Sequence, residues 1–299
     1  MNLLAIYKNG NYRVRIYDDG TKIKETILDE DDELIAEFPE SIDLKITNKC
    51  DMNCPMCHEN SHRDGEHGDI TLDFIKTIHP YTEVAIGGGN PLEHPDLLNL
   101  LTILKENKVI VNMTINQLHY MNNRVLIENL LRDKLIYGLG VSYSHYDNKF
   151  IKCIKKNSNI VLHVIAGMIS IDELEKLYDK NLKLLILGYK KFRKGESLYY
   201  SYINECIINR KINTLKIYLP EIIKHFEVVS FDNLGITQLN VKSILSNNEW
   251  NNFYQGDDGS HTFYIDMVER KFAKNSISTN RYDILNNVDD MFHKLRLSV

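Results

Sequence analysis

Three cysteines stand close together in the first fifth of the chain: Cys50, Cys54 and Cys57, spaced C-x3-C-x2-C just after the apolar run Ile42 to Ile46. Thiolates at such short intervals can turn inward from one loop onto a single inorganic centre, and their soft sulfur favours iron–sulfur clusters, zinc or copper(I). Structural zinc sites and electron-carrying cubanes usually take four protein ligands. Three cysteines on a 4Fe-4S cubane leave one iron open, and an open iron can bind a substrate or cofactor.

A second chemical feature is the run Gly87, Gly88, Gly89, Asn90, Pro91, which follows the segment 83–86. Consecutive glycines let the backbone turn sharply and let a ligand approach main-chain N–H and C=O groups closely. The Asn90 carbonyl can accept a hydrogen bond from an ammonium group, without the charge attraction that a carboxylate adds. The alternative is a glycine-rich turn that binds no ligand.

Polar residues also end two later predicted strands. Asn116 follows the strand predicted over 109–115, and Ser142 and Ser144 end the strand predicted over 138–144. Alternation along a strand puts Ser142 and Ser144 on one face, from which both can point toward a common site. The alternative for each side chain is that it caps a nearby backbone group.

The elements that must position these residues are strands that alternate with helices. We predict six core strands over 42–46, 83–86, 109–115, 138–144, 160–165 and 182–187, with helical segments between them. Parallel neighbours need long return connections, which are right-handed. The pattern therefore predicts an α/β fold whose core is a partial (β/α)6 barrel of the TIM type, with its active site at the carboxyl ends of the strands.

Two further segments flank this core. Residues 1–38 contain three short strands separated by Asn-Gly and Asp-Gly turns, which predicts an N-terminal β-meander. The core then spans residues 39–235, and residues 236–299 form a C-terminal α+β extension. A hairpin is predicted there from His261 to Asp266 and Lys271 to Ala273, and we interpret the extension as a substrate lid.

In its cysteine and glycine motifs the sequence resembles the radical SAM superfamily, whose hallmark is C-x3-C-x2-C in the loop after the first barrel strand. The resemblance implies that Cys50, Cys54 and Cys57 hold a 4Fe-4S cluster whose fourth iron is chelated by S-adenosylmethionine (SAM). Met56 departs from the aromatic residue common before the last cysteine, and Asn90 from the acid common after the glycines.

The same resemblance assigns further residues to SAM. The glycine run would receive the methionine amino group, and polar strand-end residues such as Asn116, Ser142 and Ser144 would approach the cofactor. Ile165 and Gly167 match part of the family's G-x-I-x-G-x-x-E signature, which implies that Ile165 forms an apolar wall for adenine.

The activity implied by the resemblance is reductive cleavage of SAM to a 5'-deoxyadenosyl radical, which abstracts hydrogen from a substrate. Such an enzyme needs an external electron donor such as flavodoxin or ferredoxin. The resemblance does not identify the substrate, for which a small molecule, a nucleoside and a peptide are all candidates. The alternative reading from the cysteines alone is a non-catalytic iron–sulfur or zinc protein that binds or senses its metal.

The composition of the chain limits which partners and which cellular location we expect for it. The 299 residues carry 41 acidic and 36 basic side chains, so nothing predicts wholesale nucleic-acid binding. No apolar run approaches the roughly 20 residues of a membrane span, and Met1 to Ile6 is too short for a signal peptide, so we expect a cytoplasmic protein.

Cys153 and Cys206 share helical spacing with apolar neighbours and are interpreted as inert core thiols.

Overall fold

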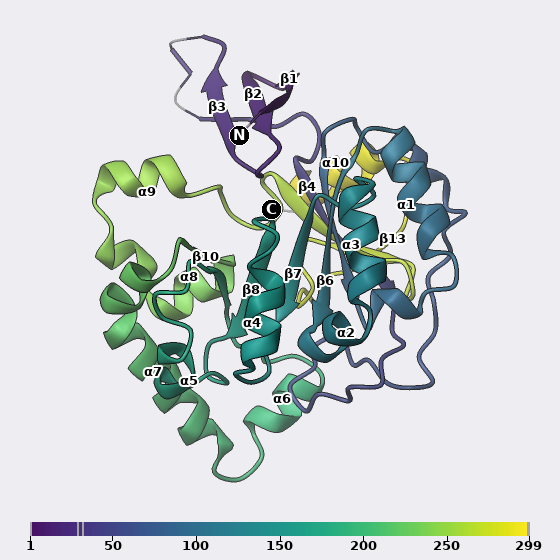
Figure 1. The fold of residues 1–299 in the computed structure, drawn as a ribbon. Helices are drawn as coiled ribbons and strands as arrows, with labels where there is room; N and C mark the ends of the chain where they lie inside the picture. Colours follow the sequence, from purple (N-terminus) through teal and green to yellow (C-terminus); the bar gives the residue numbers. More distant parts are fainter. Residues whose placement is uncertain (1, 29, 32, 298–299) are drawn as a thin grey trace.

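The computed structural model describes residues 2–28, 30–31 and 33–297. It begins with a separate three-stranded antiparallel sheet, β1 (Leu3–Asn9), β2 (Tyr12–Tyr17) and β3 (Lys22–Thr26). This is the predicted N-terminal meander, and the positive φ of Gly10 and Gly20 fits the turns between its strands. It stands at one end of the molecule, at the top of Figure 1.

The main sheet has ten strands in the order β10-β9-β8-β7-β6-β5-β4-β11-β12-β13. Each strand from β4 to β10 pairs in parallel with the next, and β11 pairs in parallel with β4. All six predicted core strands are present. The bounds of the ten strands are β4 (Ser41–Thr47), β5 (Glu83–Gly88), β6 (Ile110–Asn116), β7 (Gly138–Ser142), β8 (Ile160–Ile165), β9 (Lys183–Leu187), β10 (Val228–Phe231), β11 (Thr262–Asp266), β12 (Lys271–Ala273) and β13 (Tyr282–Asp283).

Helices form most of the connections between the parallel strands and cover one face of the sheet (Figure 1). The connection from β4 to β5 carries the cysteines and only a short 3-10 helix, Asp73–Thr77. The α-helices are α1 (Leu97–Glu106), α2 (Gln117–Asn122), α3 (Arg124–Arg132), α4 (Asn148–Ile154), α5 (Ile171–Glu175), α6 (Lys194–Tyr199), α7 (Asn204–Ile222), α8 (Asn233–Leu239), α9 (Asn247–Phe253) and α10 (Val288–Leu297), and the other 3-10 helices are Pro91–Glu93, Ile223–His225 and Val241–Ile244.

The two remaining cysteines lie on these helices. Cys153 in α4 is buried, as predicted, whereas the prediction for Cys206 was wrong because its side chain in α7 is exposed. The helical spacing near Cys206 was read as an apolar face, but α7 buries a different stripe that includes Ile208, Leu215 and Leu219.

The two faces of the main sheet differ in chemistry. In β4, Ile42, Leu44 and Ile46 belong to the main hydrophobic core, so Asp43 and Lys45 project from the opposite face. The neighbouring strands repeat this alternation, with buried aliphatic residues on the helix side. The opposite face is polar, and it carries Asn112, Thr114 and Asn116 of β6, Ser142 of β7 and His163 of β8.

The sheet curves strongly around this polar face. Lys190, just after β9, donates to Ser276 Oγ at 2.9 Å and lies 3.3 Å from His58 Nε2 in the loop after β4. In a flat sheet β9 and β12, which are seven strand spacings apart, would be about 34 Å from each other, and Ser276 lies only three residues after β12. Contacts at hydrogen-bond distance therefore require the two sides of the sheet to approach each other.

The C-terminal segment spans the open side of the curve. Asp258 accepts hydrogen bonds from Asn233, after β10, and from Asn275, after β12, each at 2.7 Å. Among the described residues no strand pairing joins β10 to β13, so no closed barrel is present. The sheet is a large, mostly parallel, curved sheet, and its description as a partial (β/α)6 barrel remains a prediction.

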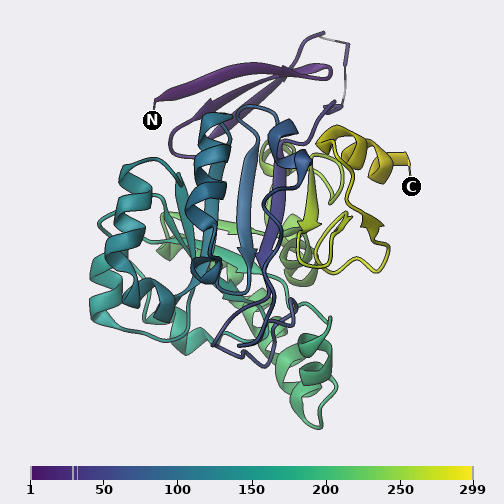
Figure 2. The same cartoon turned by 90° about the vertical axis from the view of Figure 1, so that its right-hand side faces the viewer.

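The predicted C-terminal hairpin exists as β11 and β12, but β11 is a strand of the main sheet beside β4 (Figure 2). The boundaries 1–38, 39–235 and 236–299 stay a prediction. Because β11 pairs with five residues of β4, removal of the segment would expose the strand that carries the cysteine loop.

The meander covers the amino ends of the sheet. Lys22 Nζ lies 2.7 Å from Glu83 Oε2 at the start of β5, and Tyr12 donates to Glu40 just before β4. Asn159, just before β8, donates to the Asp18 carbonyl at 3.2 Å. The polar face is thus covered by the meander at the amino ends, and the cysteine loop lies at the other end.

Candidate functional site

The cysteine loop leaves β4 at the carboxyl end of the sheet. Its backbone is held by hydrogen bonds from Cys50 N to the His62 carbonyl at 2.9 Å and from Cys57 N to the Cys54 carbonyl at 3.2 Å. Asn53 adopts a positive φ of 45°, which asparagine tolerates better than most residues and which lets the loop turn between the cysteines. All three cysteines are half-buried, so their sulfurs are accessible at a site that partly excludes water.

The electrostatic setting favours neutral thiols in the absence of a metal. Burial raises the pKa of Cys50 and of Cys54, while nearby Lys194 acts to lower the pKa of Cys54. Metal binding replaces the thiol proton, so a cation bound by these sulfurs would offset this burial effect.

One histidine supports the loop from α2. His119 Nε2 donates to Asp51 Oδ1 at 2.6 Å, and this hydrogen bond lowers the pKa of Asp51. Within the described part of the chain, Cys50, Asp51 and His119 form the one group of three metal-binding side chains whose ligand atoms all lie within 4.8 Å of one another. The sequence analysis missed His119, which lies 69 positions after Cys50 in a helix with no metal-binding pattern.

The three cysteine sulfurs are spread more widely than that group. In the part of the chain that the structure describes, they are not all within 4.8 Å of one another. A single tetrahedral zinc ion with bonds of about 2.3 Å needs sulfurs about 4 Å apart. The donor set and its spread therefore fit a larger, sulfur-bound cluster better than one zinc ion.

The glycine run lies against the cysteine loop. Gly89 N donates to the Thr47 carbonyl and Asn90 N to the Lys49 carbonyl, each at 2.7 Å, so the two loops are joined just before Cys50. A Cβ on Gly88 would lie 2.4 Å from the Thr47 carbonyl oxygen, and one on Gly89 would lie 2.2 Å from that of Lys49. A Cβ on Gly87 would meet no atom within 4 Å. Gly88 and Gly89 therefore permit close backbone packing, and Gly87 faces open space.

The other predicted SAM residues lie along the carboxyl ends of β5 to β8. Asn90 is buried, and its Oδ1 accepts a hydrogen bond from Leu92 N. Asn116 Oδ1 accepts from Leu118 N at 2.8 Å, and Asn116 Nδ2 lies 3.3 Å from Ser144 Oγ. Ser142 is in register with Asn116, and Ile165 lies at the end of β8. The structure thus brings Asn116, Ser142 and Ser144 together, and the amide oxygens of both asparagines already have backbone donors.

His163 was not singled out as a site residue, yet it lies on the polar face in register with Ser142. Its ring packs over β7, where a Cβ on Gly140 would come within 2.2 Å of it. Burial lowers the pKa of His163 to about 4, so the imidazole is neutral near pH 7. It can therefore accept as well as donate a hydrogen bond on this face.

A basic segment after β9 contacts the cysteine loop from across the site. Lys194 Nζ donates to Asn53 Oδ1 at 3.1 Å and to the Ser61 carbonyl at 2.7 Å, and Arg193 donates to the Glu59 carbonyl at 3.2 Å. Met56 packs against the apolar cluster that Tyr189 and two other buried residues form beside this segment. These contacts fix the middle of the cysteine loop and surround it with positive charge.

Asp43 is a carboxylate of the polar face whose pKa is raised above its usual range. Its side chain is surrounded by protein atoms on the polar face but remains accessible to solvent, and no hydrogen bond or ion pair within 4 Å involves it among the described residues. Desolvation by the surrounding protein raises its pKa to about 6, while Lys190 opposes this shift and the negative charges of Asp258, Glu59 and Asp232 add to it. Charges of both signs therefore lie near Asp43 on the polar face.

This shift predicts a pH-dependent effect of Asp43→Asn. The unfolded carboxyl has a pKa of about 3.9, so the folded protein holds the proton more tightly and loses stability as the pH rises through about 6. Asparagine does not titrate, so the variant should have a higher melting temperature than the parent at pH 7.5 and no such advantage at pH 3.5. Thermal unfolding followed by circular dichroism at both pH values measures this, and an equal difference at both would refute the assignment.

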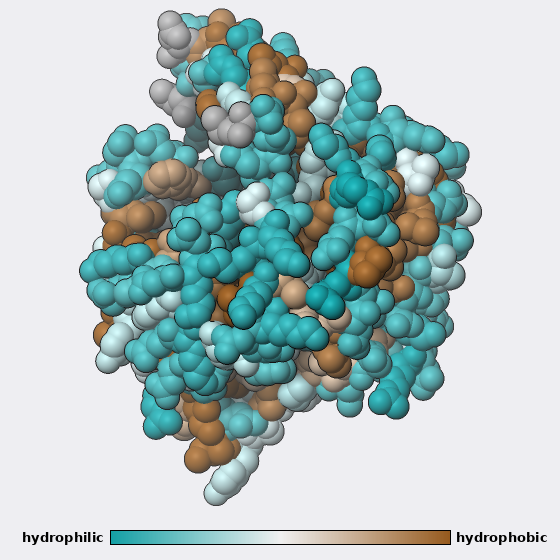
Figure 3. Space-filling view, in the orientation of Figure 1, coloured by the Kyte–Doolittle hydropathy of each residue, from teal (hydrophilic) through white to brown (hydrophobic). Residues whose placement is uncertain are grey.

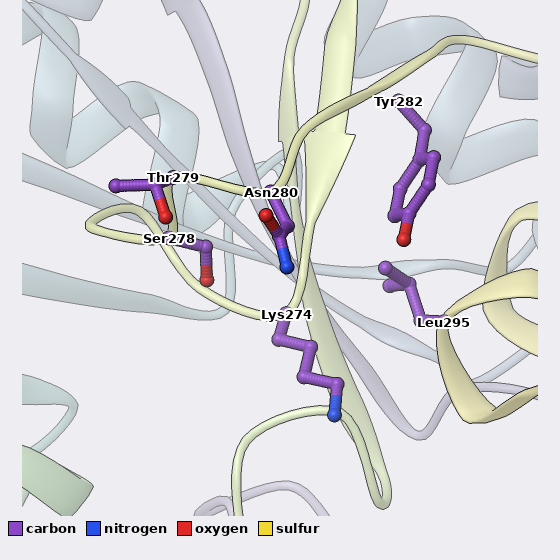
Figure 4. Close-up of a pocket in the computed structure, with 6 residues that line it drawn as sticks. All are labelled: Lys274, Ser278, Thr279, Asn280, Tyr282 and Leu295. Carbon is purple, nitrogen blue, oxygen red and sulfur yellow. The ribbon is translucent and has the colours of Figure 1, made fainter. Parts of the chain in front are cut away.

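A separate small cavity of about 210 Å³ lies at the β13 edge of the main sheet, between β12, β13 and α10 (Figure 4). It is lined by Lys274, Ser278, Thr279, Asn280, Tyr282 and Leu295. None of these is a predicted site residue, so this cavity does not enter the assignment of function.

The surface in Figure 3 is mainly hydrophilic, with hydrophobic residues in small separate patches. Across the described residues, the structure contains no helix with the length and apolar character needed to cross a membrane.

Comparisons with known proteins show partial similarity to several relatives. No family model matches it. It is 26% identical over 137 residues to the probable GTP 3',8-cyclase of Methanocaldococcus jannaschii, a match that covers 43% of this chain and 44% of the relative. It is 22% identical over 212 residues to the tungsten-containing aldehyde ferredoxin oxidoreductase cofactor-modifying protein of Pyrococcus furiosus, covering 68% of this chain and 51% of the relative.

A third relative, the 7,8-dihydro-6-hydroxymethylpterin dimethyltransferase of M. jannaschii, is 24% identical over 114 residues, covering 35% of this chain and 21% of the relative. The chain thus spans about half the length, or less, of the curated relatives it matches. Among solved structures it resembles Streptococcus suis SuiB bound to its precursor peptide SuiA, with a TM-score of 0.57, 16% identity and coverage of 89% of this chain and 65% of SuiB. SuiB bound to S-adenosylmethionine matches with the same TM-score and identity, over 89% of this chain and 66% of SuiB. At this identity the likeness to SuiB is one of fold.

Proposed function

We propose that this chain is a radical SAM enzyme that modifies its substrate by hydrogen abstraction, because it resembles that superfamily in sequence motif, relatives and fold. The curated relatives and SuiB are members of that superfamily, whose enzymes use a 4Fe-4S cluster and SAM. The observation that carries the proposal is the joining of two loops. The three-cysteine loop and the glycine run meet at the carboxyl edge of the sheet through the Lys49–Asn90 and Thr47–Gly89 hydrogen bonds.

The cysteines supply the ligands that the cluster needs. When bound, the cluster and SAM together supply one-electron cleavage of SAM to methionine and a 5'-deoxyadenosyl radical, with the electron from an external donor such as flavodoxin or ferredoxin. Cys50, Cys54 and Cys57 would hold the metal, and Asp51 and His119 would fix the loop around the first of them.

The remaining site residues would bind and orient SAM. The open space beside Gly87 supports an approach of the methionine moiety to the main chain. Asn116, Ser142 and Ser144 offer polar atoms at adjacent strand ends, and Ile165 offers an apolar surface for the adenine. The curved sheet would surround the reacting groups and reduce access of water, which protects a reactive radical from side reactions.

The substrate would contact the polar face below this site. SuiB binds a precursor peptide, whereas the cyclase and the dimethyltransferase are named for a nucleotide and a pterin. A peptide and a small heterocycle therefore both remain substrate candidates. The Asp43 carboxylate, which has no ion-pair partner among the described residues, would favour a substrate with a cationic group in either class.

The proposal predicts SAM cleavage by the reconstituted protein. After anaerobic reconstitution with iron and sulfide, addition of dithionite and SAM should release 5'-deoxyadenosine and methionine in equal amounts, measured by liquid chromatography and mass spectrometry. Samples without dithionite, or without iron, should release neither product. A protein that instead binds zinc stoichiometrically and never cleaves SAM would support the alternative of a metal-binding or sensing protein.

A further inference from the structure

We infer that Glu59 is a positioning residue that sets the Cys57 end of the cysteine loop through a buried ionic network shared with β4 and β11. This inference rests on the proposed function, because it concerns how the chain holds a cluster. Glu59 lies two residues after Cys57, and the Asn60 amide donates back to the Cys57 carbonyl at 3.2 Å. A displacement of Glu59 therefore moves the third cysteine directly.

Glu59 contacts four parts of the molecule. Its Oε2 lies 3.1 Å from Lys45 Nζ and accepts a hydrogen bond from Tyr264 at 2.9 Å. Its Oε1 lies 3.2 Å from His58 Nε2, and its carbonyl accepts from Arg193 at 3.2 Å. The side chain is thus tied to β4, to β11 and to its own loop, and its backbone to the segment after β9.

The network is nearly free of solvent. The Lys45, Asp266 and Glu59 side chains are 1%, 0% and 9% exposed. Lys45 Nζ also lies 3.0 Å from Asp266 Oδ2, and Asp266 Oδ1 accepts from the Val268 and Glu269 amides in the turn that follows β11. Lys45 therefore lies between two carboxylates, and one of them belongs to the cysteine loop.

Burial makes this arrangement sensitive to single changes. A buried charge that loses its partner is much more costly than the intact pair, so the Lys45 ammonium strongly favours one position of Glu59. Loops that make only exposed contacts lack this restraint. The strands β4 and β11, which are far apart in sequence, together fix how deep the Cys57 end of the loop sits.

The test compares Glu59→Gln with Glu66→Gln, a matched control on the same loop. Glu66 is exposed, and in the described part of the chain its side chain forms no hydrogen bond or ion pair. Both variants and the parent are reconstituted anaerobically, and iron release to a chelator is followed by the loss of visible absorption. We expect release from Glu59→Gln to be roughly 10- to 100-fold faster than from the parent, with Glu66→Gln unchanged.

A second pair of variants separates positioning from packing. Tyr264→Phe removes the hydroxyl that donates to Glu59 at 2.9 Å and lies 3.3 Å from Asp266 Oδ2, without a change of charge. It should accelerate iron release less than Glu59→Gln does, and it provides the test of Glu59 positioning if Glu59→Gln does not fold. Lys45→Met combined with Glu59→Gln should release iron no faster than Glu59→Gln alone, because the two residues act as one unit. The electron paramagnetic resonance spectrum of the reduced cluster should change in Glu59→Gln and not in Glu66→Gln.

Two outcomes would overturn the inference in distinguishable ways. If the parent takes up no cluster, the proposed function fails and the inference fails with it. If the parent takes up the cluster and Glu59→Gln, or Tyr264→Phe in its place, lowers only the melting temperature while iron release and the spectrum match the parent, Glu59 is a packing residue. Positioning of the cluster would then be refuted with the proposed function intact.

Discussion

Replacement of Cys54 with alanine should abolish the metal centre of this protein. Cys54 is the middle of three half-buried thiols on one loop, and its carbonyl accepts the hydrogen bond from the Cys57 amide. A 4Fe-4S cubane held by only two cysteines has lost a third of its protein ligands. After identical anaerobic reconstitution, iron should fall from about four atoms per chain in the parent to near zero in Cys54→Ala.

The control for this experiment is Cys206→Ala. Cys206 lies on the exposed side of α7, so its removal should leave iron content and visible absorption at the level of the parent. Circular dichroism establishes that both variants fold. Retention of full iron by Cys54→Ala would remove this cysteine from the ligand set, and selective zinc uptake by the parent would reject the cluster altogether.

The second large effect is expected in the glycine run, where neighbouring positions should respond differently. Gly88→Val should disrupt the junction between the two loops, because its Cβ would lie 2.4 Å from the Thr47 carbonyl oxygen and its φ of +111° is unfavourable for a branched residue. The backbone conformation alone should destabilise the fold by roughly 1–3 kcal/mol. Because Thr47 precedes the cysteines, cluster uptake should fall as well as SAM binding.

Gly87→Val is the informative partner of that variant. Its Cβ would meet no atom within 4 Å, so folding and iron uptake should be close to those of the parent. SAM binding, measured by anaerobic calorimetry, should be at least several-fold weaker if the cofactor lies in that space, since a branched side chain would occupy it. Unchanged SAM affinity in Gly87→Val would show that the glycine run is a structural turn.

The sequence was sufficient to predict the elements that depend on local patterns. The six core strands, the meander and the C-terminal hairpin follow from apolar periodicity and turn residues, and the structure contains all of them. The cysteines were recognisable because three ligands in eight residues form a local signal. The sequence also predicted that the cysteine loop lies near the glycine run, because the carboxyl ends of adjacent parallel strands meet at one edge of the sheet.

The buried network was not predictable in the same way. Glu59 and Tyr264 are separated by 205 positions, and no local pattern indicates that they touch. One signal was present in β4, where Asp43 and Lys45 alternate with Ile42 and Leu44 in an otherwise apolar strand. Charged residues at alternate positions of a central strand indicate a polar interior face, and they could have directed attention to Lys45.

The sheet position of the C-terminal hairpin was not predictable, for a topological reason. We interpreted the extension as a substrate lid, and that role stays a prediction, while the structure has β11 between β4 and β12 in the main sheet. Periodicity indicates that a strand exists without identifying the strand it pairs with, so the sequence pattern could not predict that β11 pairs with β4.

The pairing of β11 with β4 also affects how the protein folds during its synthesis on the ribosome. The two strands are 221 residues apart at the Lys45–Asp266 contact, so β4 lacks one neighbour until the chain has been synthesised beyond Asp266. Pairings of such long sequence separation form late, and an unpaired strand edge can associate with other chains in the meantime. The nascent chain thus passes most of its synthesis with one edge of β4 unpaired, and this edge is the part of the sheet that most needs protection from association with other chains.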